Sequence, residues 1–347
     1  MDCRNTDIAS SIVLDFETSD TDFLNGQIHS VYVSVINEDG EEIDSYENFC
    51  RSESFRLSSP KALFVNGIKN DVLFEGAHPL DVHLELKNFI SKYPGVPIVA
   101  YNANFDFKFA FQGLFQAGDS EPYFWKKNRS IVCAHHLTRA QYMNDPTALN
   151  VPLVEGQLSF KQENIGAANG IFFPRHSAKG DVLTCRAIMN KIKKNSSDLI
   201  YKAEYFGKKA NTLTFLHKAR FIVAPCGWKN NFSVRCLVPL AFDSNESNFL
   251  ALDIGMINPT DISMEEQYPP FSATYISSGL TKKSNRNFPF VKLPINQGML
   301  FEDESMWKAS EPSSGVDFET LCERAASARN DAQLNDIAER ALIFDQN

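Results

Sequence analysis

The stretch SIVLDFETSD, residues 11–20, places two carboxylates at the end of an apolar run. Its aliphatic beginning predicts a buried β-strand, and Asp15 and Glu17 stand where that strand ends. Residues i and i+2 of a strand point to the same face, so the two carboxylates repel each other at close range. Such a pair requires a positive partner, and a metal ion is the simplest candidate.

The composition indicates a folded globular protein of two or three domains. The chain has 347 residues, of which 43% are hydrophobic and 12% aromatic. No run approaches the ~20 apolar residues of a membrane span, and the first residues lack the apolar segment of a signal peptide. The seven Cys show no CxxC spacing, which favours reduced thiols over a zinc cluster. We therefore expect a cytoplasmic protein without membrane contact.

Charge is distributed unevenly along the chain, whose net charge is −9. Residues 186–229 hold ten Lys or Arg against two acids, a balance of +8. From residue 302 to the end, eleven acids stand against four bases, a balance of −7. Only the basic stretch is suited to hold a polyanion.

Hydrophobic periodicity predicts an α/β domain followed by a β-rich one. The first part has strand-like runs at 11–17, 27–37, 41–50 and 96–101, the first three forming an antiparallel meander, and helices at 78–93, 102–118 and 181–194. Between residues 213 and 300, short β-rich runs broken by Pro, Gly and Asn predict a small antiparallel barrel. A linker at 310–315 precedes a helical segment at 316–344.

Three further positions join the first acid pair. The pattern D-x-E occurs four times, but only the pair at 15 and 17 ends an apolar strand. Asp106 follows the strand at 96–101 and stands between two Phe, where a solvated acid is not expected. His176 and Asp181 form the one His-x4-Asp pattern, at the start of the last helix of this part.

Each position also has a plain structural interpretation. A D-x-E pair is usually solvated, and Asp106 alone could be an acid that interacts with a helix N-terminus. Asp181 alone could be an N-cap, and His176 a surface histidine. Together, however, the acid pair on the first strand, the acid after the fourth strand and the His and Asp at the last helix resemble the DEDDh family of 3′→5′ exonucleases, which has a ribonuclease H-like fold.

The chemistry of phosphodiester hydrolysis explains why such a set is needed. The reaction adds negative charge to a centre that is already anionic, and two Mg²⁺ ions about 4 Å apart would offset this charge. Mg²⁺ prefers oxygen ligands, so a few carboxylates suffice, and we expect Mn²⁺ to substitute for it. His176 can accept a proton near neutral pH, since the ordinary histidine pKa is about 6.5.

A closer resemblance, to the exonuclease I family of single-strand-specific DNA exonucleases, extends over roughly residues 10–300. It rests on LSSPKALFVNGI, YNANFDFKF and SFKQENIGAANGI in the first half, and on residues 227–255 and 288–301 in the second. It implies a ribonuclease H-like exonuclease domain at 1–196, an SH3-like β-barrel domain at 197–305, and a linker with a short C-terminal helical segment at 306–347. The family's helical domain is represented only by residues 317–344, so high processivity does not follow from the resemblance.

The resemblance also implies roles for individual residues. Asp15, Glu17 and Asp181 would hold the metals, Asp106 would complete the acid set, and His176 would be the general base. Glu17 would also contact the substrate, as would Lys161, which stands where the family has a basic residue. It further implies release of 5′-mononucleotides from single-stranded DNA in repair or recombination, with a single-stranded-DNA-binding protein as a partner, by a monomeric enzyme.

The basic stretch supplies further candidates for substrate binding. Because the acids repel DNA in the absence of metal, Lys208, Lys209 and Lys218 are expected to hold the strand.

Two alternatives remain open from the sequence. The first is a DEDDh exonuclease that acts on RNA. The second is a catalytically weak single-strand-DNA-binding module that uses Trp228, Lys229, Phe232 and Arg235, although Phe232 is better explained by barrel packing.

Overall fold

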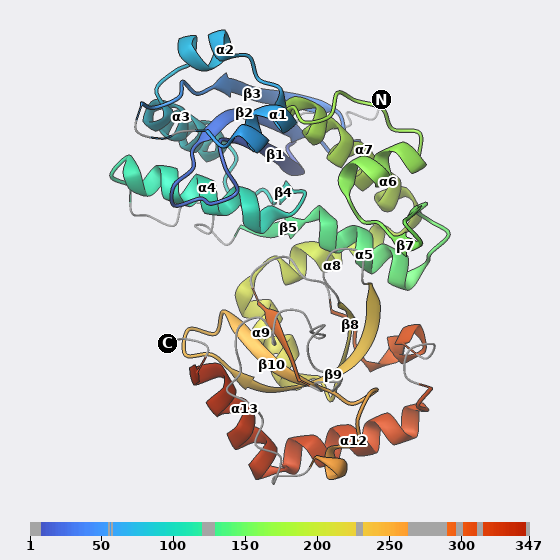
Figure 1. Cartoon of the computed structure of the whole chain (residues 1–347). Helices are drawn as coiled ribbons and strands as arrows, with labels where there is room; N and C mark the ends of the chain where they lie inside the picture. Colours follow the sequence, from blue (N-terminus) through green and yellow to red (C-terminus); the bar gives the residue numbers. More distant parts are fainter. Residues whose placement is uncertain are drawn as a thin grey trace. The chain divides into compact units, whose positions relative to one another are not determined.

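The chain divides into two compact units (Figure 1). The computed structural model describes residues 8–54, 56, 58–119, 129–226, 232–262, 290–295, 301–310 and 315–344. One unit comprises Met1–Thr138 and Phe160–Lys208, and the other comprises Arg139–Ser159 and Lys209–Asn347. In the described ranges, no helix combines the length and the apolar character needed to cross a membrane. The three-domain division expected from the sequence stays a prediction.

The first unit is built on a mixed five-stranded sheet with the strand order β3-β2-β1-β4-β5. Its strands are β1 Ser11–Thr18, β2 Ile28–Ile36, β3 Glu42–Phe49, β4 Ile98–Ala100 and β5 Ile131–Cys133. Strands β1, β2 and β3 pair antiparallel, which confirms the predicted meander, whereas β4 pairs parallel with both β1 and β5. Strand β1 therefore lies in the middle of the sheet, bonded on both edges.

The alternation of side chains along β1 separates a core face from a functional face. Ile12, Leu14 and Phe16 belong to one buried cluster, to which helices α3 (Pro79–Ser91) and α4 (Ala103–Gln116) also contribute. Val13 is fully buried outside that cluster, and Asp15 and Glu17 share its face because strand side chains alternate. Helix α7 (Ala178–Asn195) packs on β1 and β2.

Helices account for most of the remainder of this unit (Figure 1). They are α1 Pro60–Asn66, α2 Asn70–Glu75, α3 Pro79–Ser91, α4 Ala103–Gln116, α5 Ala134–Asn144, α6 Gln162–Ala168, α7 Ala178–Asn195 and α8 Ser197–Phe206, of which α5 continues into the second unit. The three helices predicted in this part are confirmed as α3, α4 and α7. Helices α1, α2, α5, α6 and α8 were not predicted.

The second unit is built on a four-stranded antiparallel sheet with the order β11-β10-β9-β8. Its strands are β8 Ile222–Cys226, β9 Ser233–Phe242, β10 Asn248–Asp253 and β11 Phe290–Pro294, and a separate hairpin joins β6 Leu153–Val154 to β7 Gln157–Leu158. Each strand of the sheet lies in one of the predicted apolar runs, and the antiparallel pairing is confirmed. Closure into an SH3-like barrel stays a prediction.

Helices precede and follow this sheet in the sequence. Helix α9, Lys209–Lys218, precedes the sheet, so the expectation of β-structure from residue 213 is wrong for this segment. Two 3₁₀ turns lie in the described part of this unit, η2 Pro259–Asp261 and η3 Glu304–Ser310. The helical segment predicted after the linker consists of two helices, α12 Phe318–Asn330 and α13 Ala332–Phe344, which pack on β9.

Candidate active site

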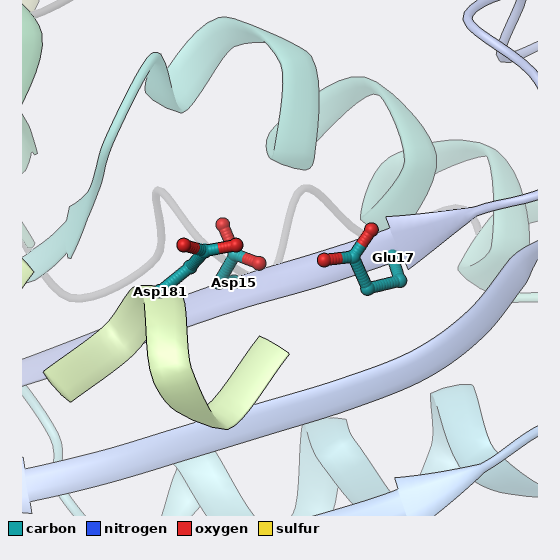
Figure 2. A group of neighbouring side chains, drawn as sticks. All are labelled: Asp15, Glu17 and Asp181. Carbon is teal, nitrogen blue, oxygen red and sulfur yellow. The ribbon is translucent and has the colours of Figure 1, made fainter. Parts of the chain in front are cut away.

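Three carboxylates from two elements meet on the functional face of β1. Asp15 and Glu17 come from the strand and Asp181 from the first turn of α7, and one carboxylate oxygen of each lies within 4.8 Å of the others. Figure 2 shows Asp15 and Glu17 projecting from the same strand, with Asp181 beside Asp15. This is the one group of three or more potential metal ligands among the described residues.

The start of α7 is built so that Asp181 reaches this position. Ser177 is the N-cap, and its Oγ accepts a hydrogen bond from the Gly180 backbone N–H at 3.2 Å. Asp181 is therefore a first-turn residue, and the N-cap interpretation is wrong. A Cβ at Gly180 would lie 1.7 Å from the carbonyl oxygen of Pro174, so only glycine lets the preceding loop lie against the helix.

Asp106 is held against the same strand from the neighbouring helix. It lies in the first turn of α4, its side chain is 2% exposed, and its Oδ1 accepts a hydrogen bond from the Phe16 backbone N–H at 3.1 Å. Phe16 stands between Asp15 and Glu17, so this bond attaches the fourth acid to the strand that carries the first two.

The pKa shifts show that the protein alone does not stabilise these negative charges. Burial raises the pKa of Asp15 well above its ordinary value, and the charges of Asp106, Asp181 and Glu17 raise it further. Burial and the charge of Asp181 raise the pKa of Glu17 to about 7. Burial raises the pKa of Asp181 to about 6, although the charge of His176 opposes this shift. Burial also raises the pKa of Asp106, against the hydrogen bond from Phe16.

These residues fit a divalent cation of the hard, oxygen-binding class. Four carboxylates in mutual repulsion are stabilised by a cation, and every candidate ligand atom in the close group is a carboxylate oxygen. Such a donor set suits Mg²⁺ or Mn²⁺, whereas structural zinc sites are usually built from Cys and His.

His176 lies next to Asp181 in a left-handed backbone conformation, with φ 55°. Its backbone N–H and its charge both lower the pKa of the Asp181 carboxyl, and the residue is exposed. The structure thus brings all five predicted residues, the four acids and His176, to one place.

Three neighbours of Asp181 were not singled out from the sequence. The charge of Glu163 raises its pKa, the charge of Arg175 lowers it, and the side-chain amide of Gln162 donates to its backbone carbonyl. The position of Arg175 directly before His176 was the available sequence signal.

The predicted substrate-binding lysines have varied surroundings. Lys161 is exposed at the N-cap position of α6, and Lys218 is exposed in the last turn of α9. Lys208 is half-buried, and the Lys209 Nζ donates to the backbone carbonyl of Asn245 at 2.5 Å. Their part in substrate binding stays a prediction.

The basic stretch is less positive than its composition suggests. Acids from other segments pair with bases of this stretch: Glu42 with Arg186, Glu38 with Lys193, and Glu304 with Arg220.

The structure describes two of the four residues proposed for a pure binding module, Phe232 and Arg235. Arg235 is 9% exposed and pairs with Asp253, which lies 3.3 Å away, so it is not a surface contact for DNA. Phe232 packs edge-on against Tyr142, as expected for a structural residue. Trp228 and Lys229 lie outside the described residues.

Comparison with known proteins places this geometry in a known fold. No protein-family model matches the chain, and no curated protein matches it in sequence. Among solved structures, exonuclease I from Methylocaldum szegediense, a moderately thermophilic enzyme, is similar with a TM-score of 0.83 at 18% identity, covering 96% of this chain and 73% of that chain. The zinc ion-bound form of an E. coli ExoI–ssDNA complex is similar with a TM-score of 0.79 at 18% identity, with coverages of 97% and 73%.

An E. coli ExoI/SSB-Ct complex gives a TM-score of 0.80 at 18% identity, covering 97% of this chain and 74% of that chain. The predicted resemblance is therefore confirmed in three dimensions. The chain has the exonuclease I fold.

Proposed function

We propose that the protein is a metal-dependent exodeoxyribonuclease that degrades single-stranded DNA from the 3′ end and releases 5′-mononucleotides. One observation carries the proposal: Asp15, Glu17, Asp106 and Asp181 converge from three elements in a chain with the exonuclease I fold. A protein that only binds DNA has no need of four clustered acids, because they repel the phosphates.

The carboxylates would hold two Mg²⁺ ions, which would neutralise charge at the phosphate and lower the pKa of the attacking water. Asp15, Glu17 and Asp181 offer their oxygens directly, and pairing with β2, where Asp15 lies opposite Tyr32 and Glu17 opposite Ser30, keeps the first two fixed. The bond from Phe16 fixes the orientation of Asp106. A ring nitrogen of His176 accepts the proton of the water, as a general base.

The rest of the molecule would bind and present the strand. Glu17, Lys161, Lys208, Lys209 and Lys218 are the proposed substrate contacts. The similarity to the ExoI/SSB-Ct complex supports a single-stranded-DNA-binding protein as a partner, and a role in DNA repair or recombination follows from such a substrate.

The test is a nuclease assay on single strands labelled at the 3′ or the 5′ end. With Mg²⁺, we expect immediate loss of the 3′ label as a mononucleotide and gradual shortening of the 5′-labelled strand, and no reaction in excess EDTA. Asp181→Asn should abolish turnover, since it replaces a charged ligand by a neutral amide. Equal activity in EDTA would refute the proposal, and faster degradation of a matched RNA would favour the RNA exonuclease.

A further inference from the structure

The segment of residues 172–176, Phe-Phe-Pro-Arg-His, forms an exposed loop that ends at the proposed general base, and we call it the aromatic loop. Phe172 is 76% exposed and Phe173 is 40% exposed. Arg175 is exposed as well, and it forms no ion pair or hydrogen bond with the described part of the chain. Two phenyl rings in water beside an unpaired guanidinium have no role in the core of this unit.

The aromatic loop is fixed in position at both ends. Before it, the Ile171 N–H donates to the carbonyl of Gly166 at 2.9 Å. Within it, the carbonyl of Pro174 lies against Gly180 and accepts a hydrogen bond from Ser177 Oγ at 3.3 Å. The exposed side chains are thus carried by a backbone that is set by α6 and α7, which limits the ordering cost of binding a ligand.

The aromatic loop also lies close to the acids. Ser177, the residue after His176, is the N-cap of the helix whose first turn carries Asp181. The backbone N–H of His176 and the positive charge of Arg175 both lower the pKa of the Asp181 carboxyl. A nucleotide whose phosphate reaches the acids would therefore pass beside this loop. Exposed aromatic rings next to a cation are the chemistry with which proteins bind single strands, because a base stacks on the ring while the cation binds phosphate.

We propose that the aromatic loop binds the last two nucleotides at the 3′ end of the strand, with Phe172 stacked on a base and Arg175 bound to a phosphate. This inference rests on the proposed function, and it identifies the part of the site that binds the 3′ end of the strand.

Phe172 is tested with a substrate that lacks the stacking partner. Kinetics are compared for wild type and Phe172→Ala on oligo-dT, with either normal or abasic residues as the last two nucleotides. Loss of one stacked base should raise the KM of Phe172→Ala by about 5- to 150-fold with kcat unchanged. On the abasic strand the two proteins should have the same KM, and Phe172→Tyr should retain the wild-type KM on the normal strand.

The matched control is Phe115→Ala, which removes a ring that is 60% exposed in the last turn of α4. It should leave KM unchanged on both strands. An unchanged KM for Phe172→Ala would overturn the assignment, as would a rise that persists in full on the abasic strand.

Arg175 is tested by salt dependence. Arg175→Ala should flatten the plot of log affinity against log salt by about 0.7, the contribution of one bound phosphate on a single strand. Lys92→Ala removes an exposed cation at the end of α3, outside the basic stretch, and should leave the slope unchanged. A wild-type slope in Arg175→Ala would overturn its role.

The experiments distinguish a wrong role for the aromatic loop from a wrong proposed function. If wild type hydrolyses DNA but these variants behave like it, only the role of the aromatic loop is refuted. If wild type does not hydrolyse DNA, the proposed function is refuted, and fluorescence anisotropy of the same labelled oligonucleotides still tests whether Phe172 and Arg175 hold the strand.

Discussion

The raised pKa values of Glu17 and Asp181 make the stability of the metal-free protein depend on pH. The pKa of Glu17 is raised to about 7 from an ordinary 4.5, so the folded state holds a proton that the unfolded state releases. The stability contributed by this group is therefore highest below pH 4.5 and falls until the pH reaches about 7. Asp181, with its pKa raised to about 6, acts in the same direction.

This predicts that Glu17→Gln stabilises the metal-free protein more at high pH than at low pH. Burial lowers the pKa of His29 and His83 to about 4, which gives a stability change of opposite sign, so the variant must be compared with wild type at each pH. In EDTA, the Tm of Glu17→Gln should exceed that of wild type by a margin that grows from about pH 5 to pH 8. Adding Mg²⁺ at pH 8 should raise the Tm of wild type more than that of the variant. A constant margin would contradict the raised pKa.

Replacing His176 separates chemistry from binding. His176→Ala should lower kcat by about 10²- to 10⁴-fold, the usual contribution of a general base, with little change in DNA affinity. Single-turnover hydrolysis and anisotropy measure the two quantities. His217→Ala, at an exposed histidine of α9, is the control and should change neither. A large loss of affinity would make His176 a structural residue.

Side-chain chemistry made the site residues predictable, while backbone chemistry did not. Asp15 and Glu17 stood out because charged groups at the end of an apolar strand are costly without a partner. The donor that holds Asp106 is the backbone N–H of Phe16, which every residue except proline carries, so nothing in the sequence marks it. The importance of Arg175 depends on the path of a loop that periodicity does not describe.

At the scale of elements, the packing of the aromatic loop against α7 predicts the effect of Gly180→Ala. The added Cβ would meet a backbone oxygen at 1.7 Å, so the loop or the helix start must move and carry His176 with it. We expect kcat to fall by a larger factor than the equilibrium constant for folding. Ser177→Ala, the control at the same helix start, removes a cap worth about 1 kcal/mol and should lower stability with a smaller effect on kcat. Chemical denaturation and kcat are the measurements, and equal activity losses would contradict this prediction.

Long or strongly alternating elements were predictable, and most short ones were not, although the three-residue strand β4 was found from its apolar run. Helix α7 has 18 residues with an apolar stripe, and the meander strands have eight or nine residues each. Strand β5 has three residues, too few to show a period, and it forms because β4 pairs with it. Helix α8 places Leu199, Ala203 and Phe206 on one side, but short helices depend on packing for their stability, which the sequence does not display.

At the scale of the whole molecule, strand binding should depend on several cations. The triple replacement of Lys208, Lys209 and Lys218 by Ala should flatten the salt dependence of DNA affinity by about 0.7 log units for each phosphate that these lysines bind. Little effect is expected on kcat at saturating DNA. Lys92→Ala, at an exposed lysine of the first unit, is the control. A triple variant with the wild-type slope would show that the strand binds elsewhere.

Domain organisation was the hardest level to predict, because segments far apart in the sequence belong to one unit. Arg139–Ser159 belongs to the same unit as Lys209–Asn347, and nothing in the sequence marks this association. The charge balance of residues 186–229 was also an incomplete guide, since Glu38, Glu42 and Glu304 neutralise bases of that stretch from far along the chain.

The alternation along β1 has a consequence for which changes of length the protein can survive. Ile12, Leu14 and Phe16 face the core, and Asp15 and Glu17 face the opposite way. Inserting or deleting one residue early in this strand would exchange the two faces, bringing both acids into the apolar layer and the core residues into the site. The length of this strand therefore cannot change one residue at a time during evolution. A homologue that gains or loses one residue early in the strand would lose both the fold and the activity.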